Sequence, residues 1–186
     1  PINNQIVRLG TDYGGWSFVN SPSLKNSTII AAGMGEDISF EIDFSASYNA
    51  RVILIDPTPR SIKHYDLVIE RIGKKKEIQY SSGGAQDPAS YDLKSVTKTN
   101  LIMLPVALAE DDGEAEFFMP INQNNVSHSL NANMHGINKK DSITVKKMTI
   151  KSICNLVKLD LTDIEILKID IEGAELEIIE YLINSN

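Results

Sequence analysis

Four short apolar runs limit what this chain can fold into. Each run is shorter than an ordinary helix, and each stops at a glycine, a proline or an aspartate. Runs of this kind, bounded by turn residues, are typical of strands that are buried on both faces of a parallel sheet. They therefore predict an α/β fold. The four runs cover residues 28–32, 51–55, 101–104 and 164–169.

Helical patterns separate these predicted strands. Over residues 37–50, apolar side chains recur four positions apart, which is the spacing of one helix face. Thr58 and Thr149 are suited to cap two further helices, because a threonine hydroxyl accepts a hydrogen bond from the first turn. A last helix is expected to begin near Ala174. The alternation of strand and helix predicts a mainly parallel sheet that is covered by helices on both faces.

The remaining segments are polar. Residues 74–99 predict a loop with little regular structure. The sequence Asp111-Asp112-Gly113 predicts a tight turn into a strand over residues 114–119, and hence a hairpin. Residues 120–142 form a second polar stretch, which we expect either to close over an acceptor or to be disordered. A strand is expected over residues 143–148.

Composition excludes several classes of function. The formal net charge of −7 argues against a nucleic-acid partner, which requires a basic surface. The single cysteine, Cys154, cannot form an internal disulfide, so we expect a cytoplasmic location. No apolar run approaches the roughly 18 residues that a membrane span needs, and the histidines lack the spacing of metal ligands. The length of 186 residues fits one domain, with an N-terminal segment over 1–27 and a core over 28–186.

Small and acidic residues mark the ends of the predicted strands, where parallel sheets bind their ligands. Asp56 follows the first glycine of the first turn by about 20 residues, the spacing at which an acidic side chain accepts hydrogen bonds from a ribose. The sequence therefore predicts a site for a ribose-containing cofactor. The strand-end residues are Gly33, Gly35, Glu36, Asp37, Asp56 and Asp170.

The turn after the first strand, residues 33–37, is called the glycine turn, and it distinguishes two classes of cofactor. A dinucleotide places its diphosphate at the following helix N-terminus, where Glu36 and Asp37 would repel it and Ile38 replaces the third glycine of the usual pattern. S-adenosylmethionine carries an ammonium and a sulfonium in place of phosphates, so the same acids favour it. Each feature also has a plain structural explanation: the glycines form a turn, the acids stabilise a helix, and Asp56 caps a turn.

Five segments of the chain resemble one known family. The segments ILKIDIEGAELEIIEYL, IIAAGMGEDISFE and VILIDPTPRSI are similar to the FkbM family of S-adenosylmethionine-dependent methyltransferases. The segments VALAEDDGEAEFF and LGTDYGGW also resemble the patterns of that family. The most specific match is KIDIEGAE, residues 168–175, and together the matches run from about Leu9 to the last residue.

The resemblance implies a class I methyltransferase fold, which is a Rossmann-like three-layer sandwich with a mainly parallel sheet. It also implies S-adenosylmethionine as cofactor and a hydroxyl acceptor on a sugar, a glycan or a secondary metabolite. It places Gly33 and Gly35 at the methionine portion, Asp56 at the ribose hydroxyls, and Asp170 between the methionine end and the acceptor. The residues that it places beside the adenine are Val106, Ala107 and Leu108.

Methyl transfer to a hydroxyl is an in-line displacement, in which the enzyme aligns donor and acceptor and helps to remove a proton. Asp170 and Glu172 are candidate bases because they follow the last predicted strand. His128, in the second polar stretch, is a further candidate. Glu172 is alternatively an acid that stabilises the last helix, and His128 is alternatively an ordinary loop residue.

The chain departs from the family pattern at the first strand. Many methyltransferases have an acid where this chain has Ala31, and a third glycine where it has Asp37. Our hypothesis is that Glu36 or Asp37 supplies the missing carboxylate to the ammonium of the cofactor. The rival interpretations are an oxidoreductase with an NAD-type cofactor and a non-catalytic Rossmann-like interaction domain.

Two further expectations concern the edges of the fold. Four parallel strands are too few for the implied sheet, so we expect the chain to lack its C-terminal strands and to leave a sheet edge exposed. Strands at residues 120–122 and 143–148 that complete the sheet would contradict this. Tyr13 and Trp16 are expected to fasten the N-terminal segment to the sheet rather than to cover the cofactor.

Overall fold

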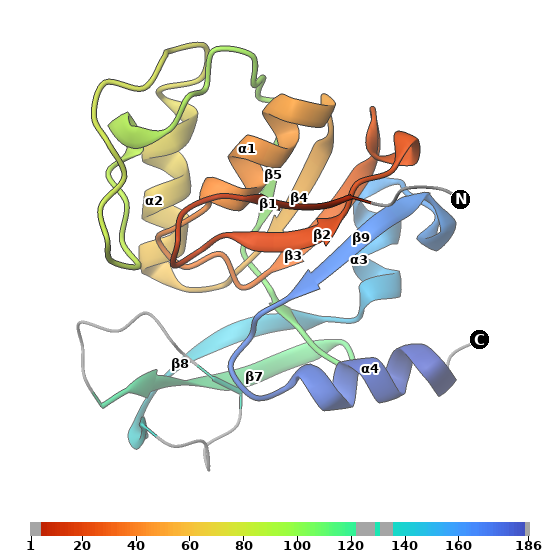
Figure 1. Ribbon diagram of the computed structural model, residues 1–186. Helices are drawn as coiled ribbons and strands as arrows, with labels where there is room; N and C mark the ends of the chain where they lie inside the picture. The colour runs from red at the N-terminus through yellow and green to blue at the C-terminus, as the bar shows by residue number, and fades with distance from the viewer. Residues whose placement is uncertain (1–4, 122–128, 131–135, 185–186) are drawn as a thin grey trace.

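A parallel sheet forms the centre of the computed structural model, which describes residues 5–121, 129–130 and 136–184 (Figure 1). Its strand order is β5-β4-β3-β9, and all three pairings are parallel. The four strands predicted from the apolar runs are confirmed with the same bounds. They are β3 (Thr28–Ala32), β4 (Arg51–Ile55), β5 (Leu101–Leu104) and β9 (Ile164–Ile169).

Helices cover both faces of this sheet, as its alternating side chains require (Figure 1). Ile29 and its neighbours on that face pack with α1 (Ser39–Tyr48) and α2 (Pro59–Ile69). Ile30, which points to the opposite face, packs with α3 (Ile150–Val157) and α4 (Glu175–Asn184). Both faces of the strands are therefore apolar. No helix in the described part of the chain is long and apolar enough to cross a membrane.

The predicted helix caps are present. The hydroxyl of Thr58 accepts a hydrogen bond from the backbone of Ser61, and that of Thr149 accepts one from the backbone of Ser152. Asn49, in the left-handed conformation, ends α1 two residues before β4 begins. Thr58 thereby fixes the start of α2 at the carboxyl end of β4, and Asn49 fixes the turn that enters β4 at its opposite end.

A second, three-stranded sheet corrects two of the predictions. It contains β6 (Ala107–Leu108), β7 (Gly113–Pro120) and β8 (Ile137–Met148) in the order β6-β8-β7. The end of the polar stretch 120–142 was predicted wrongly, because β8 begins inside it at Ile137. Residues 122–128 and 131–135 of this stretch lie outside the described part of the chain.

The predicted hairpin at residues 111–113 is also wrong, since the strands on either side of the turn both pair with β8 and not with each other. The turn residue Asp112 instead accepts hydrogen bonds from the backbone of Thr149 and the hydroxyl of Ser152, at the start of α3. The carboxylate thus supports the first turn of a helix rather than a hairpin.

The second sheet does not complete the first. None of β6, β7 and β8 pairs with β9, whose one paired neighbour in the described part of the chain is β3. Instead, β7 and β8 pair with each other in antiparallel orientation over the length of β7. They lie beyond the carboxyl end of the parallel sheet (Figure 1).

The N-terminal segment forms a hairpin of β1 (Ile6–Leu9) and β2 (Trp16–Val19), followed by a short 3-10 helix at Pro22–Leu24. Phe18 fastens this hairpin to α1, since its ring contacts those of Phe40, Phe44 and Tyr48 at centroid distances of 6.0, 5.3 and 5.9 Å. Edge-to-face contacts of this kind favour a fixed orientation. The turn between β1 and β2 is thereby held beside the start of α1.

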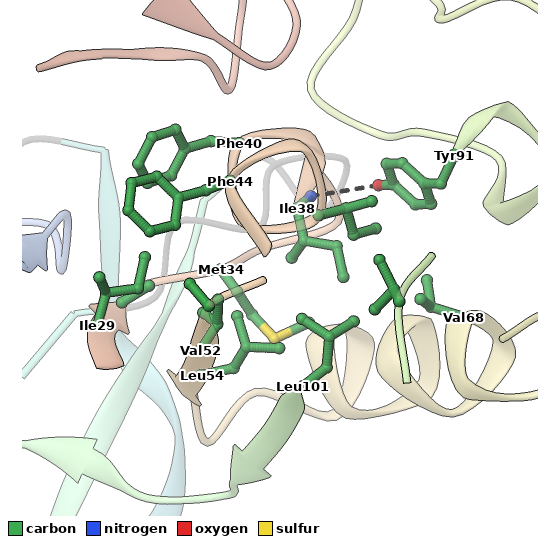
Figure 2. Packing of buried hydrophobic residues seen from close by; sticks show 14 of the residues in the cluster. Ile29, Met34, Ile38, Phe40, Phe44, Val52, Leu54, Val68, Tyr91 and Leu101 are labelled. Atoms are coloured by element: carbon green, nitrogen blue, oxygen red, sulfur yellow. Dashed lines mark hydrogen bonds between the residues drawn. The ribbon is translucent and has the colours of Figure 1, made fainter. Parts of the chain in front are cut away.

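The polar stretch 74–99 has the little regular structure that was predicted, a 3-10 turn at Pro88–Ser90. Three of its side chains are nevertheless buried in the core, namely those of Tyr91, Leu93 and Val96. The hydroxyl of Tyr91 accepts a hydrogen bond from the backbone N–H of Ile38, with 3.2 Å between the two atoms. Figure 2 shows this bond as a dashed line. The loop therefore packs against the start of α1.

The ends of β3 and β9 meet at Gly33. This glycine has a φ of +80°, and a Cβ atom at this position would lie 1.7 Å from the carbonyl oxygen of Asp170. The backbone N–H of Asp170 donates to the carbonyl of Ala32 at 3.0 Å. Only a glycine allows the two chains to approach this closely.

We expect Gly33→Ala to lower the free energy of unfolding by about 2–4 kcal/mol, because it adds a steric clash to the cost of a positive φ. Gly73→Ala is the matched control, since Gly73 has a φ of +85° but open space around it. It should lose only about 1 kcal/mol. Urea denaturation measures both, and equal losses would contradict the close packing at Gly33.

Candidate functional site

A cavity opens where β3, β4 and β9 end. Ten of the eleven site residues predicted from the sequence line it, although they come from four separate segments of the chain. The eleventh, His128, lies outside the described residues. The ten are Gly33, Gly35, Glu36, Asp37, Asp56, Val106, Ala107, Leu108, Asp170 and Glu172.

The cavity has further walls that the sequence analysis did not assign to it. One comes from the turn between β1 and β2, one from the polar stretch 74–99, one from β7 and the residues near it, and one from β9. Tyr13 and Trp16 were expected to fasten the N-terminal segment to the sheet, but both line the cavity and Tyr13 is 66% exposed. Trp16 also contacts the sheet as expected, since its ring centroid lies 5.4 Å from the ammonium of Lys168 in β9, and Phe18 packs the same hairpin against α1. The additional lining residues include Tyr13, Gly14, Trp16, Gly84, Phe117, Leu130 and Lys168.

Asp56 holds the glycine turn in place. One of its carboxylate oxygens accepts hydrogen bonds from the backbone N–H groups of Met34 and Gly35, at 3.1 and 3.0 Å. The other accepts from the backbone and the hydroxyl of Thr58, at 2.8 and 2.7 Å. A carboxylate offers about four acceptor positions, so the buried Asp56 uses its capacity on the protein itself. Asp56 therefore does cap a turn, which was the plain structural explanation for this residue.

Asp37 joins the N-terminal turn to the start of α1. Its carboxylate accepts hydrogen bonds from the hydroxyl of Thr11 at 2.6 Å and from the backbone of Ser39 at 3.0 Å. Gly14 lies so close that a Cβ atom there would be 2.6 Å from the carboxyl carbon. The sequence analysis did not assign this contact, and the pair Gly14-Gly15 is the signal that could have indicated it, because glycines permit a close approach of the backbone.

Glu36 and Gln86 attach the polar stretch 74–99 to the glycine turn. The backbone N–H of Gln86 donates to the carbonyl of Glu36 at 2.9 Å, and its buried side-chain amide donates to Asp37 at 3.4 Å. The carboxylate of Glu36 forms an ion pair with Arg60. No periodic pattern in the sequence indicates the contacts of Gln86, because they join one loop to another.

Lys168 lies beneath the glycine turn. Its side-chain ammonium donates to the carbonyl of Gly33 and to the carboxylate of Glu41, both at 3.0 Å, and it lies 5.4 Å from the ring centroid of Trp16. Both charged side chains are almost completely buried. Burial raises the pKa of Glu41, and the charge of Lys168 opposes that rise. This ion pair connects β9, α1 and the glycine turn at one point.

The loop after β9 holds Glu172 in an uncommon conformation. Glu172 has a φ of +61°, which is rare for a residue with a side chain. The carboxylate of Glu175 accepts from the backbone of Ile171 at 3.0 Å and of Gly173 at 2.8 Å, and the hydroxyl of Ser129 donates to the carbonyl of Glu172 at 2.6 Å. Glu175, and not Glu172, thus binds the backbone at the start of α4. Glu172 itself lines the cavity.

The charge of the cavity is uneven. Five carboxylate side chains line it, those of Glu36, Asp37, Asp56, Asp170 and Glu172, whereas Lys168 is the one lysine or arginine that lines it in the described part of the chain. The wall near β6 and β7 is apolar, with Val106, Leu108, Phe117 and Leu130. Such a site suits a ligand with a flat apolar part at one end and positive charge at the other.

Comparison with known proteins gives one match. The family model described as Methyltransferase FkbM domain matches residues 39–185, which is most of the chain. No curated protein and no solved structure matches the chain. The matched residues contain β4, β9 and the loops at their ends, and they leave out the glycine turn and the N-terminal turn that complete the cavity.

We expect Glu172→Gly to be more stable than Glu172→Gln by about 1 kcal/mol, because glycine removes the cost of the left-handed backbone. Both variants lack the carboxylate, so the comparison isolates the backbone. Thermal or urea unfolding measures the difference. A glutamine variant as stable as the glycine variant would show that the loop carries no such strain.

Proposed function

The chain belongs to the FkbM methyltransferase family, and from this premise we propose that it transfers a methyl group from S-adenosylmethionine to a hydroxyl oxygen. The acceptor that we propose is a sugar, a glycan or a related small molecule. The observation that carries the proposal is the acidic cavity at the ends of β3, β4 and β9. It lies where open α/β sheets bind their ligands.

The charge of this cavity favours the proposed cofactor over a dinucleotide. A diphosphate at the start of α1 would meet the carboxylates of Glu36 and Asp37, and the ion pair of Glu36 with Arg60 neutralises only one of them. An ammonium and a sulfonium meet attraction at the same place. The oxidoreductase alternative is therefore not favoured, in agreement with the family match.

The residues present fit S-adenosylmethionine with one adjustment. Val106 and Leu108 offer an apolar surface for the adenine, and the glycine turn leaves room for the methionine portion beside Lys168. Asp56 is the residue that we propose for the ribose hydroxyls, although its carboxylate already accepts four hydrogen bonds. We propose that the ribose shares these oxygens with Met34 and Gly35, which also keeps the glycine turn ordered around the ligand.

When bound, S-adenosylmethionine supplies an electrophilic methyl group. Asp170 then has two tasks, which are to orient the acceptor hydroxyl in line with that methyl group and to take its proton as the new bond forms. Its side chain is exposed, and no described residue gives its carboxylate a hydrogen bond. Its backbone is fixed against Gly33 and Ala32. A free carboxylate on a rigid backbone is suited to this role. Glu172 and His128 remain the other candidate bases.

We expect the protein to transfer radiolabel from S-adenosylmethionine to at least one member of a panel of sugars and glycans. Asp170→Asn should reduce turnover about 100-fold or more, since general-base assistance contributes factors of about 10²–10⁴. It should keep its affinity for S-adenosylhomocysteine. Unchanged turnover would end the case for Asp170. Cofactor binding without transfer to any acceptor would support the non-catalytic interaction domain instead.

The hypothesis that an acid of the glycine turn binds the ammonium is tested by Glu36→Gln and Asp37→Asn. We expect at least one of them to weaken binding of S-adenosylhomocysteine about tenfold, which is the value of one hydrogen bond to a charged group. Binding of methylthioadenosine, which lacks the ammonium, should not change in that variant. Calorimetry measures both ligands. If both variants bind S-adenosylhomocysteine as the wild type does, neither acid is the partner.

A further inference from the structure

The side chain of Lys168 reaches the part of the cavity where the amino-acid end of the cofactor would lie. It extends from β9 to the glycine turn and donates to the carbonyl of Gly33 at 3.0 Å. Gly33 in turn lies against the backbone of Asp170, the proposed base. In the proposed binding mode Lys168 therefore lies at the methionine portion, and Val106 and Leu108 border the adenine.

The charges of S-adenosylmethionine require a cation at this place. Its amino-acid end carries a carboxylate as well as an ammonium, and most ionisable groups that line the cavity are acids. A carboxylate brought among them without a positive partner would be strongly disfavoured. In the described part of the chain, Lys168 is the one lysine or arginine side chain that lines the cavity.

The ammonium of Lys168 also has capacity for another acceptor. A lysine ammonium has three N–H groups, and the oxygens of Gly33 and Glu41 take two of them. The remaining neighbour that the structure records is the indole of Trp16, with its centroid at 5.4 Å, and that ring itself lines the cavity. A cation–π contact of this length fixes the ammonium without using an N–H on an oxygen.

We propose that Lys168 binds the carboxylate of the amino-acid end of S-adenosylmethionine, an inference that rests on the proposed function. Glu41 holds the lysine under the turn, and the ring of Trp16, which also lines the cavity, lies 5.4 Å from the ammonium by its centroid. The same side chain then orders the glycine turn, through the carbonyl of Gly33, and recognises the ligand. The ion pair with Glu41 thus has a function in ligand recognition as well as in packing.

The test compares two ligands that differ only in the carboxylate, namely S-adenosylhomocysteine and its decarboxylated analogue S-adenosyl-3-thiopropylamine. Because Lys168→Met alone would leave the carboxylate of Glu41 buried without its cation, the variants compared are Glu41→Gln and the double variant Glu41→Gln with Lys168→Met. These differ only at the lysine. Lys94→Met, on the exposed part of the polar stretch, is the control for loss of a lysine elsewhere.

We expect the preference for S-adenosylhomocysteine over the analogue, measured by calorimetry as a ratio of dissociation constants, to fall about tenfold or more when Lys168 is removed. It should not change in Lys94→Met. A lysine that only supports the fold would weaken both ligands by the same factor, so an unchanged ratio would overturn the inference and leave the proposed function standing. A wild-type protein that binds neither ligand would overturn the proposed function, and this inference with it.

Discussion

The contact between the ends of β3 and β9 determines how the rest of this protein is arranged. Gly33 has no side chain, and its backbone therefore lies against the carbonyl of Asp170. Lys168 strengthens the same junction by donating to the Gly33 carbonyl from below, with its charge balanced by Glu41 on α1. Two loops that are far apart in the sequence are thus held as one rigid surface. The glycine turn and the acidic end of β9 keep a fixed relation to each other.

The other walls of the cavity depend on this junction through hydrogen bonds. Asp56 binds the backbone of the glycine turn from β4, and Asp37 binds Thr11 in the turn between β1 and β2. Ser129 connects the neighbourhood of the second sheet to the loop after β9 through the carbonyl of Glu172. The acids in this region therefore have structural duties in addition to any contact with a ligand. A site built in this way is largely formed before its ligand binds.

Sequence reasoning predicted the parts of the fold that local patterns determine. The four strands of the parallel sheet and the helix caps at Thr58 and Thr149 were found where their residues indicated, because burial on both faces and capping leave clear local signals. The ten described site residues meet at one cavity because parallel strands end at the same edge of a sheet.

The missed features depend on contacts between distant segments. No periodic pattern in the polar stretch 120–142 indicates that β8 begins at Ile137, since the backbone there pairs with the distant strand β7. The burial of Tyr91 in a polar loop and the contact of Trp16 with Lys168 are likewise non-local.

The proposal on which the others depend is that the acidic cavity binds S-adenosylmethionine rather than a dinucleotide. Calorimetric titration of the wild-type protein with S-adenosylhomocysteine and with NAD tests it most directly. We expect one site for S-adenosylhomocysteine and no binding of NAD, and tight binding of NAD alone would rule out the proposed cofactor.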